Sequence, residues 1–252
     1  MPEHHLQHHI ISGFIRVVTD IQTYIPAFWA HPVHGGPFPG IVVLHDDWGL
    51  QAVARTTAHR LAEAGYYVIV PDLFEGNRAS NQLEADALEA RYKDSSESKV
   101  NAGLEALRTH PKCNRKMAVL GWDLGADIAM QLALDHDDIM AAVALSGDPS
   151  PLFGKFDELR CPLLAIFGGQ DPLSMHAKRL EQELQQSDNR HRVIVYPEAQ
   201  HAFYNHLAEQ DYNHKIAERA FAELLFFLEE HQGKPPAPSS MGLGSFYHGR
   251  VY

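Results

Sequence analysis

Basic residues and long apolar runs are scarce in this chain, and each shortage excludes a class of protein. Lys and Arg number 21 against 32 Asp and Glu, which leaves a formal net charge of -11. This balance disfavours nucleic-acid binding, because phosphate contacts need clustered Lys and Arg. No apolar run approaches the roughly 18 residues that a membrane-spanning helix needs. We therefore expect neither a nucleic-acid partner nor a membrane partner.

Cysteine is also scarce, with only Cys113 and Cys161. Two thiols make no disulfide framework, and we interpret Cys161 as a packing residue rather than a nucleophile. The histidine-rich residues 1–9 lack the basic-then-apolar layout of a secretion signal. A transition-metal site is one interpretation of these histidines, but we favour a solvated polar tail. We expect a cytoplasmic protein.

The composition predicts one domain. The chain has 252 residues, of which 45% are hydrophobic and 21% are charged, as in an ordinary globular domain. We assign residues 10–232 to a single α/β domain, because no internal repeat or second unit is visible. Residues 233–252 begin with Gly-Lys-Pro-Pro-Ala-Pro and are predicted to be a flexible tail.

Strand-like and helix-like segments alternate along the domain. Such alternation predicts a doubly wound, mostly parallel sheet flanked by helices, with polar strand exits along one edge. Residues 77–98 are predicted to form a loop and a helix over that edge, separate from a helix over 100–108. The expected strands are 10–18, 22–29, 41–44, 67–73, 118–120, 141–145, 163–167 and 193–196. The other expected helices contain 54–62, 126–134, 175–184 and 214–230.

The most informative stretch is 118–126, which reads Ala-Val-Leu-Gly-Trp-Asp-Leu-Gly-Ala. A buried strand, a Gly-x-Asp-x-Gly turn and an apolar helix are typical of a nucleophile elbow. In such an elbow Asp123 stands at the carboxyl end of the sheet, beside the amino end of a helix, where negative charge is favoured. The motif alone is weak evidence, so the rest of the chain has to support it.

Two further strand exits complete a candidate triad. Asp171 follows the strand over 163–167, and His201 follows the strand over 193–196. The order of nucleophile, acid and histidine is the one that α/β-hydrolases use. We predict that His201 acts as a general base and that Asp171 orients its ring.

With these residues the chain resembles the dienelactone hydrolase family of the α/β-hydrolase superfamily. The resemblance covers most of residues 10–232 and implies a single α/β-hydrolase domain with Asp123, Asp171 and His201 as the triad. It further implies an oxyanion hole made by the backbone N–H groups of Leu124 and Asp47. The matching segments are 39–45, 61–66, 70–74, the elbow, 167–172 and 196–203.

The departures from the family pattern change the expected chemistry. Asp123 stands where the family has its nucleophilic cysteine, and a glutamate that partners that thiol in the family falls at Asp46. The arginines that bind the substrate carboxylate in dienelactone hydrolases fall on Leu88 and Asn205. A dienelactone with a free carboxylate is therefore not the expected substrate.

An aspartate at the elbow suits attack on a tetrahedral carbon. Expulsion of halide or opening of an epoxide leaves an alkyl ester on Asp123, which water activated by His201 can hydrolyse. Haloalkane dehalogenases and epoxide hydrolases use Asp/His/Asp chemistry of this kind. At an ester carbonyl the carboxylate is a poor nucleophile, so ester or lactone hydrolysis would need Asp123 or His201 as a general base for water.

Four residues near the elbow are candidate substrate contacts. The indoles of Trp48 and Trp122 would offer N–H donors to a leaving halide, although a pocket or core role is the favoured interpretation of both. Asp46 and Phe203 are the other two candidates. The substrate is expected to be a small molecule.

Crowded acids also allow a metal hypothesis. A site made from His45, Asp46, Asp123 and His201 has no fixed ligand spacing, so we predict no metal and no cofactor. Like charges held together raise one another's pKa, so Asp123 is predicted to be protonated or its neighbourhood to hold a cation.

The sequence therefore predicts a hydrolase of a small ester or lactone, or of a carbon–halogen bond or epoxide. The alternative is a protein that has lost the nucleophilic thiol and binds a small molecule without turnover. Retention of both Asp171 and His201 favours activity, because a pure binding protein has no need of an oriented base. We expect a monomer or a homodimer.

Overall fold

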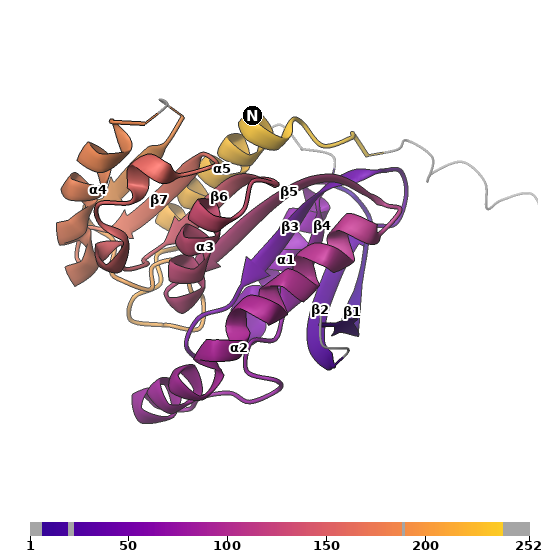
Figure 1. Cartoon of the computed structure of the whole chain (residues 1–252), viewed down its shortest axis with the longest axis horizontal. Coiled ribbons are helices and arrows are strands. Elements are labelled where there is room, and N and C mark those ends of the chain that lie inside the picture. Colours follow the sequence, from indigo (N-terminus) through magenta and orange to yellow (C-terminus); the bar gives the residue numbers. More distant parts are fainter. Residues whose placement is uncertain (1–6, 20–22, 188–189, 239–252) are drawn as a thin grey trace, which may run out of the picture.

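An eight-stranded sheet forms the centre of the computed structural model, which describes residues 7–19, 23–187 and 190–238 (Figure 1). Its strand order is β1-β2-β4-β3-β5-β6-β7-β8. The pairs β1–β2 and β2–β4 are antiparallel, and all the other pairs are parallel. The strands are β1 Ile10–Val18, β2 Tyr24–Pro32, β3 Phe38–Leu44, β4 Tyr67–Pro71, β5 Cys113–Trp122, β6 Ile139–Leu145, β7 Leu163–Gly168 and β8 Arg192–Tyr196.

Helices cover both faces of the sheet. Helices α1 (Ala52–Glu63) and α5 (His214–Gln232) pack on one face, and α2 (Gln82–Thr109), α3 (Leu124–Asp135) and α4 (Ala177–Leu184) pack on the other. Strand β3 is buried along its whole length, as expected for a strand covered on both faces. The predicted doubly wound α/β architecture is confirmed. The short 3-10 helices are Ser150–Leu152, Phe156–Glu158 and Pro172–His176.

Helix α2 differs from the prediction in one respect, because the helix expected within residues 77–98 and the helix expected over 100–108 form one continuous helix of 28 residues. Residues 77–81 precede it, in agreement with the expected loop. Its polar middle is compatible with a helix because the Ser95 and Ser96 hydroxyls both donate to the Tyr92 carbonyl. Serine hydroxyls that bond back to the preceding turn remain within a helix. Buried Tyr92 and Val100 then hold both halves of α2 against the sheet.

The two ends of the described chain meet. His8, predicted to lie in a solvated tail, is 8% exposed, and its ring nitrogen lies 2.9 Å from the carbonyl oxygen of Pro236. The tail assignment therefore does not hold for His8. His4, His5 and residues 239–252 lie outside the described residues, so their predicted tail character stays a prediction.

No helix in the described part of the chain is long and apolar enough to cross a membrane.

Candidate active site

The strand-to-helix turn places Asp123 in a strained backbone conformation. Asp123 lies between β5 and α3 with φ 52° and ψ -123°, a region that non-glycine residues rarely occupy. The two glycines of the motif make the turn possible. A Cβ on Gly121 would lie 2.2 Å from the backbone of Gly125, and a Cβ on Gly125 would lie 2.3 Å from the Leu44 carbonyl oxygen. This geometry is that of the predicted nucleophile elbow.

Asp123, His201 and Asp171 come together at the carboxyl edge of the sheet. His201 Nε2 lies 3.1 Å from Asp123 Oδ1, and His201 Nδ1 lies 2.8 Å from Asp171 Oδ2. The other oxygen of Asp171 accepts the Leu173 backbone N–H at 2.9 Å, and the Asp171 side chain is 1% exposed. A buried carboxylate fixed on both oxygens holds the imidazole in one orientation.

The two carboxylates determine the charge of His201. The Asp123 carboxylate, followed by that of Asp171, accepts an N–H of the imidazole and raises the pKa of His201 to about 10. The resting imidazole is therefore protonated at neutral pH and cannot accept a proton. It becomes a base only when Asp123 loses its negative charge, as happens when a carboxylate is converted to an ester.

Tyr204 is a further contact of Asp123, which the sequence analysis missed. Its hydroxyl donates to Asp123 Oδ2 at 2.8 Å. Burial and the Asp123 carboxylate hold the pKa of Tyr204 well above its usual range, so the hydroxyl remains a donor. This bond directs one oxygen of Asp123 toward Tyr204 and leaves the other beside His201. The only signal in the sequence was that Tyr204 follows His201 by three positions.

Ser146, at the end of β6, supports the loop that carries His201. The Ser146 hydroxyl donates to the His201 carbonyl oxygen at 3.0 Å. The residue has φ 52°, and its N–H donates to the Ile166 carbonyl of the neighbouring strand. Ser146 thereby connects the exits of β6, β7 and β8, and no motif marks it in the sequence.

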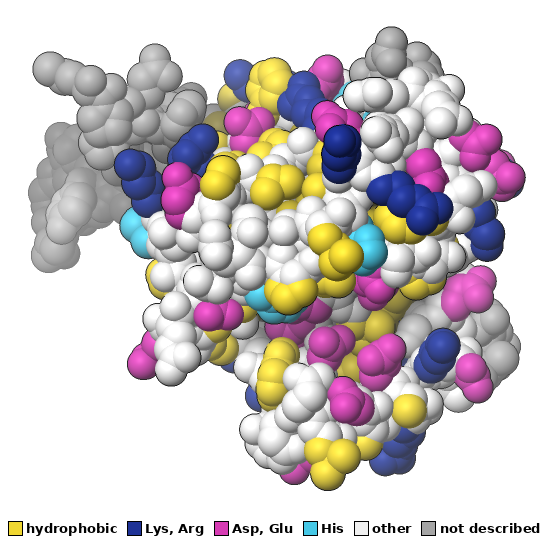
Figure 2. Space-filling view, turned by 90° about the vertical axis from the view of Figure 1, so that its left-hand side faces the viewer, with side chains coloured by type: hydrophobic (Ala, Val, Ile, Leu, Met, Phe, Trp, Pro, Cys, Tyr) yellow, Lys and Arg dark blue, Asp and Glu magenta, His cyan; other side chains and the backbone are white. Residues whose placement is uncertain are grey.

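A cavity of about 190 Å³ opens in front of Asp123 and His201. Figure 2 shows acidic side chains gathered around a hollow in this face of the molecule. The sequence analysis did not identify Glu89, Asp148 or Leu173 as part of the site. The cavity is lined by Asp47, Glu89, Asp123, Leu124, Asp127, Ser146, Asp148, Leu173 and His201.

The four predicted substrate contacts lie outside this lining. Phe203 is 0% exposed and Trp122 is 2% exposed, and both pack in the core on the α1/α5 face. Because neither side chain lines the cavity, Phe203 is corrected from a substrate contact to a packing residue, and Trp122 has the core role that the sequence analysis favoured. Asp46 is 4% exposed and accepts the Trp48 backbone N–H. Burial, followed by the charge of Asp123, raises the pKa of Asp46 to about 7.

The carboxylate of Asp47 lies beside the predicted oxyanion hole. Burial and the charge of Asp123 raise the pKa of Asp47 to about 6, whereas the His201 cation and the Leu124 N–H lower it. A carbonyl oxyanion at this position would therefore meet the negative charge of Asp47 unless that carboxyl group is protonated.

His45 has a structural role behind the elbow. Its Nδ1 lies 2.8 Å from the Asp46 carbonyl oxygen, and its Nε2 accepts the Leu73 N–H at 2.9 Å. Complete burial lowers the pKa of His45 to about 4, so the ring is neutral. Both ring nitrogens are engaged, which argues against the metal hypothesis that used His45. Among the described residues no group of three or more His, Cys, Asp or Glu has a metal-binding arrangement.

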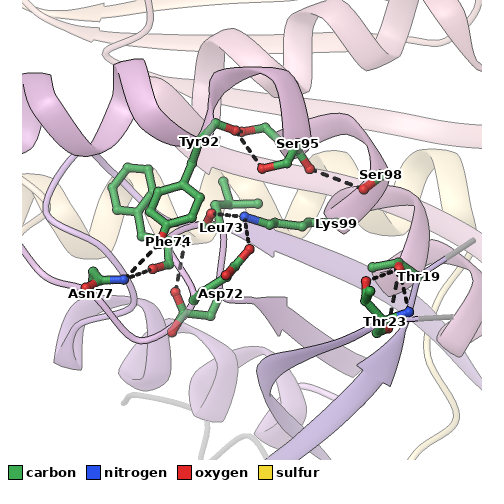
Figure 3. Close-up of polar contacts among 12 residues, drawn as sticks. Thr19, Thr23, Asp72, Leu73, Phe74, Asn77, Tyr92, Ser95, Ser98 and Lys99 are labelled. Atoms are coloured by element: carbon green, nitrogen blue, oxygen red, sulfur yellow. Dashed lines mark hydrogen bonds and ion pairs between the residues drawn. The ribbon is translucent and has the colours of Figure 1, made fainter. Parts of the chain in front are cut away.

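Lys99 of α2 binds the backbone that follows β4 (Figure 3). Its ammonium donates to the Leu73 carbonyl at 2.7 Å, pairs with Glu75 at 2.9 Å and lies 4.1 Å from the centre of the Tyr92 ring. The Lys99 side chain is 2% exposed. Because Leu73 also bonds to His45, Lys99 fixes the β4 exit against the β3 exit, and thereby the backbone that carries Asp46 and Asp47.

Asp127, in the first turn of α3, makes stability depend on pH. Burial is the main cause that raises its pKa to about 7; the Asp148 backbone N–H opposes the rise, and the Asp148, Asp47 and Asp123 carboxylates add to it. The folded protein therefore keeps the Asp127 proton at pH values where the unfolded chain has lost it. The contribution of this proton to the free energy of unfolding is complete below about pH 4 and is lost as the pH rises through about 7.

Asp127→Asn is accordingly expected to stabilise the fold in a pH-dependent way. Asparagine keeps the oxygen that accepts the Asp148 N–H but carries no charge. At pH 8 the variant should unfold with a free energy about 2 kcal/mol above that of the wild type, and at pH 4 the two should agree. Urea unfolding between pH 4 and pH 8 measures the difference, and a difference that does not change with pH would contradict the assignment.

Comparison with known proteins agrees with this geometry. The sequence model of the Dienelactone hydrolase family matches residues 25–232. Relatives from Yersinia pestis and Escherichia coli both bear the name "Putative carboxymethylenebutenolidase". The first is 26% identical over 246 residues, covering 90% of this chain and 92% of the relative. The second is 27% identical over 246 residues, covering 89% of each.

Solved structures show the same fold. The dienelactone hydrolase from Anabaena variabilis superposes with a TM-score of 0.67 at 19% identity, covering 89% of this chain and 99% of that one. A dienelactone hydrolase-like promiscuous phosphotriesterase from metagenomic libraries has a TM-score of 0.77 at 22% identity, covering 88% and 98%. With the family match over most of the domain, the elbow and the strand order, the chain belongs to the dienelactone hydrolase family.

Proposed function

We propose that this protein is a hydrolase that opens a small epoxide through an ester on Asp123. The observation that carries the proposal is the position of the Asp123 carboxylate. It stands at the elbow with one oxygen bonded to Tyr204 and the other 3.1 Å from His201. A carboxylate held in this way is ready to attack a tetrahedral carbon in the cavity.

The first step forms the ester. An Asp123 oxygen attacks one epoxide carbon, that carbon–oxygen bond breaks, and the ring oxygen takes the electron pair together with a proton. Asp47 is the proposed proton donor, because it lines the same cavity and its pKa is raised to about 6, close to the operating range of a general acid. The acidic lining favours an epoxide over an alkyl halide, because a halide ion would leave into a field of negative charge.

The second step returns the enzyme to its resting state. Esterification removes the charge of Asp123, so the pKa of His201 falls and its proton passes to solvent through the 43% exposed ring. Neutral His201 then takes a proton from water as that water attacks the ester carbonyl. The adduct collapses, the departing alkoxide takes the proton of the new carboxylic acid and leaves as the diol, and Asp123 regains a carboxylate that contains one oxygen from water. Asp47 regains its proton from solvent, which balances the proton that His201 released.

Direct hydrolysis of an ester or lactone substrate is less compatible with the site. The Asp47 carboxyl group lines the cavity beside the Leu124 N–H that would stabilise a carbonyl oxyanion, and its negative charge would oppose that oxyanion. The nucleophile is also a carboxylate, and the adduct it forms at an acyl carbon expels carboxylate more readily than alkoxide. Both features oppose the acyl chemistry of a cysteine nucleophile.

The alternative is a small-molecule binding protein without turnover, and one observation favours it. His201 is protonated at rest by its contacts with Asp123 and Asp171, so the ion pair is stable until a substrate removes the charge of Asp123. A protein that only binds a ligand would leave this pair unchanged.

A single-turnover experiment in heavy-oxygen water tests the mechanism. With enzyme in excess over a small epoxide, the diol should be free of label, and the peptide that contains Asp123 should gain one labelled oxygen. Direct attack by water would reverse this pattern, with a labelled diol and an unlabelled Asp123. Absence of turnover across a panel of small epoxides would favour the binding protein.

A further inference from the structure

The cavity in front of Asp123 is almost uniformly negative. Asp47, Glu89, Asp123, Asp127 and Asp148 contribute five carboxyl groups to its lining. His201 is the one basic residue that lines it, and neither Lys nor Arg belongs to this lining among the described residues. The elbow and the proposed triad identify the site, and these charges indicate which kind of substrate it would bind.

Asp47 and Asp127 form no ion pair with Lys or Arg among the described residues, although the charge of His201 also lowers the pKa of Asp47. Asp127 Oδ1 accepts the Asp148 N–H at 2.6 Å. His201, the remaining basic group of the cavity, is held by Asp123 and Asp171.

Two buried carboxylates outside this lining are compensated. Asp72 accepts the N–H groups of Phe74 and Gly76 and lies near Lys99, and Asp171 pairs with His201. In the cavity Asp123 pairs with His201 and Asp148 lies 3.9 Å from His176, so Asp47, Glu89 and Asp127 are the lining acids for which the described residues provide no ion pair. Such an arrangement costs folding free energy, because like charges repel and buried charges lose hydration.

The raised pKa values agree with that arrangement. Burial and neighbouring carboxylates raise the pKa of Asp127 to about 7 and that of Asp47 to about 6. A cation seated between them would lower both values and recover the missing attraction. An anionic group at the same place would meet repulsion instead.

The volume of the cavity limits the size of this cation. About 190 Å³ is below the range of roughly 300–1,000 Å³ typical of pockets for drug-sized ligands. The lining offers Leu124 and Leu173 as apolar contacts, enough for a short carbon chain between the reacting group and the charge.

We propose that the substrate is a small epoxide that bears a positively charged nitrogen, held by Asp127 and its neighbours Asp148 and Glu89. This rests on the proposed epoxide hydrolysis for the reacting group, whereas the preference for a cation rests on the cavity itself. The cationic end lies against α2 and α3, and the epoxide lies at Asp123.

Three matched epoxides test the preference. Glycidyltrimethylammonium carries the cation, its carbon-for-nitrogen isostere is neutral, and glycidate carries a carboxylate. At pH 7.5 and low salt the value of kcat/KM should fall in that order, with the cationic substrate about tenfold or more above the neutral isostere. The ratio should shrink in high salt, because screening weakens attraction between charges.

Two variants locate the effect. Asp127→Asn should reduce the ratio of cationic to neutral kcat/KM severalfold. Asp94→Asn removes the same charge from the exposed surface of α2, outside the cavity, and should leave the ratio unchanged. Equal ratios in the wild type and in Asp127→Asn would overturn the proposal, as would a preference for the neutral isostere.

A binding measurement separates this inference from the proposed reaction. Calorimetric titration with choline and with its uncharged carbon isostere requires no turnover. Choline should bind more tightly to the wild type than the isostere does, and Asp127→Asn should remove the difference. If no epoxide is hydrolysed but choline binds in this way, the reaction fails and the cation site stands. If epoxides are hydrolysed without a preference for charge, the reaction stands and the cation site fails.

Discussion

His201→Ala is expected to convert the protein from a catalyst into a trap for its substrate. The proposed first step uses Asp123 and a proton from Asp47, so the ester should still form. The second step needs His201, and without it kcat should fall by about 10²–10⁴-fold, as is typical when a general base is removed. One equivalent of epoxide should therefore accumulate on the protein.

Intact-mass measurement reads this outcome directly. The variant should gain the full mass of one epoxide molecule, because ring opening releases no leaving group, and peptide mapping should place the adduct on Asp123. His206→Ala, at an exposed histidine outside the cavity lining, should turn over without accumulation. Steady turnover by His201→Ala, or an adduct elsewhere, would contradict the mechanism.

Gly121→Ala is expected to have the largest effect on folding. The added Cβ would lie 2.2 Å from both the carbonyl carbon and the carbonyl oxygen of Gly125. Both are backbone atoms, so no side chain can move aside and the elbow itself would have to open. We expect a loss of about 4 kcal/mol or more, at the upper end of single-substitution effects and comparable with the whole stability of many domains.

Gly103→Ala is the matched control for this substitution. Gly103 lies within α2, and its added Cβ would meet side chains no closer than 3.6 Å. Replacing a helical glycine by alanine should be neutral or should stabilise the fold by about 0.5–1 kcal/mol. Urea unfolding followed by circular dichroism compares the two variants. A Gly121→Ala protein as stable as the wild type would show that the elbow is not tightly packed.

Local sequence patterns predicted the architecture because strands and helices bury their apolar faces in characteristic periods. Runs such as 41–44 and 163–167 lie in β3 and β7, and the parallel order brings their polar exits to one edge. The boundary predicted between residues 98 and 100 was wrong, because α2 continues through it. The hydroxyls of Ser95 and Ser96, just before that boundary, bond back to the Tyr92 carbonyl of the same helix. Composition alone does not reveal these hydrogen bonds within the helix.

The proximity of the three proposed triad residues was predictable for a similar reason. Asp123, Asp171 and His201 each follow a strand directly, and the carboxyl ends of parallel strands meet. Tyr204 and Ser146 could not be found in this way, because their contacts with Asp123 and His201 depend on where a loop turns in space. Nor could the sequence show that Phe203 points into the core rather than into the cavity.

The sequence by itself therefore determined the family, the sheet, the elbow and the substitution of aspartate for the family's thiol. Those features depend on neighbouring residues and on strand ends, whose chemistry is local. Only the tertiary structure decided the charge of the cavity and the protonation state of His201. Asp47, Glu89, Asp127 and Asp148 come from four separate segments, and burial together with mutual repulsion acts through space rather than along the chain.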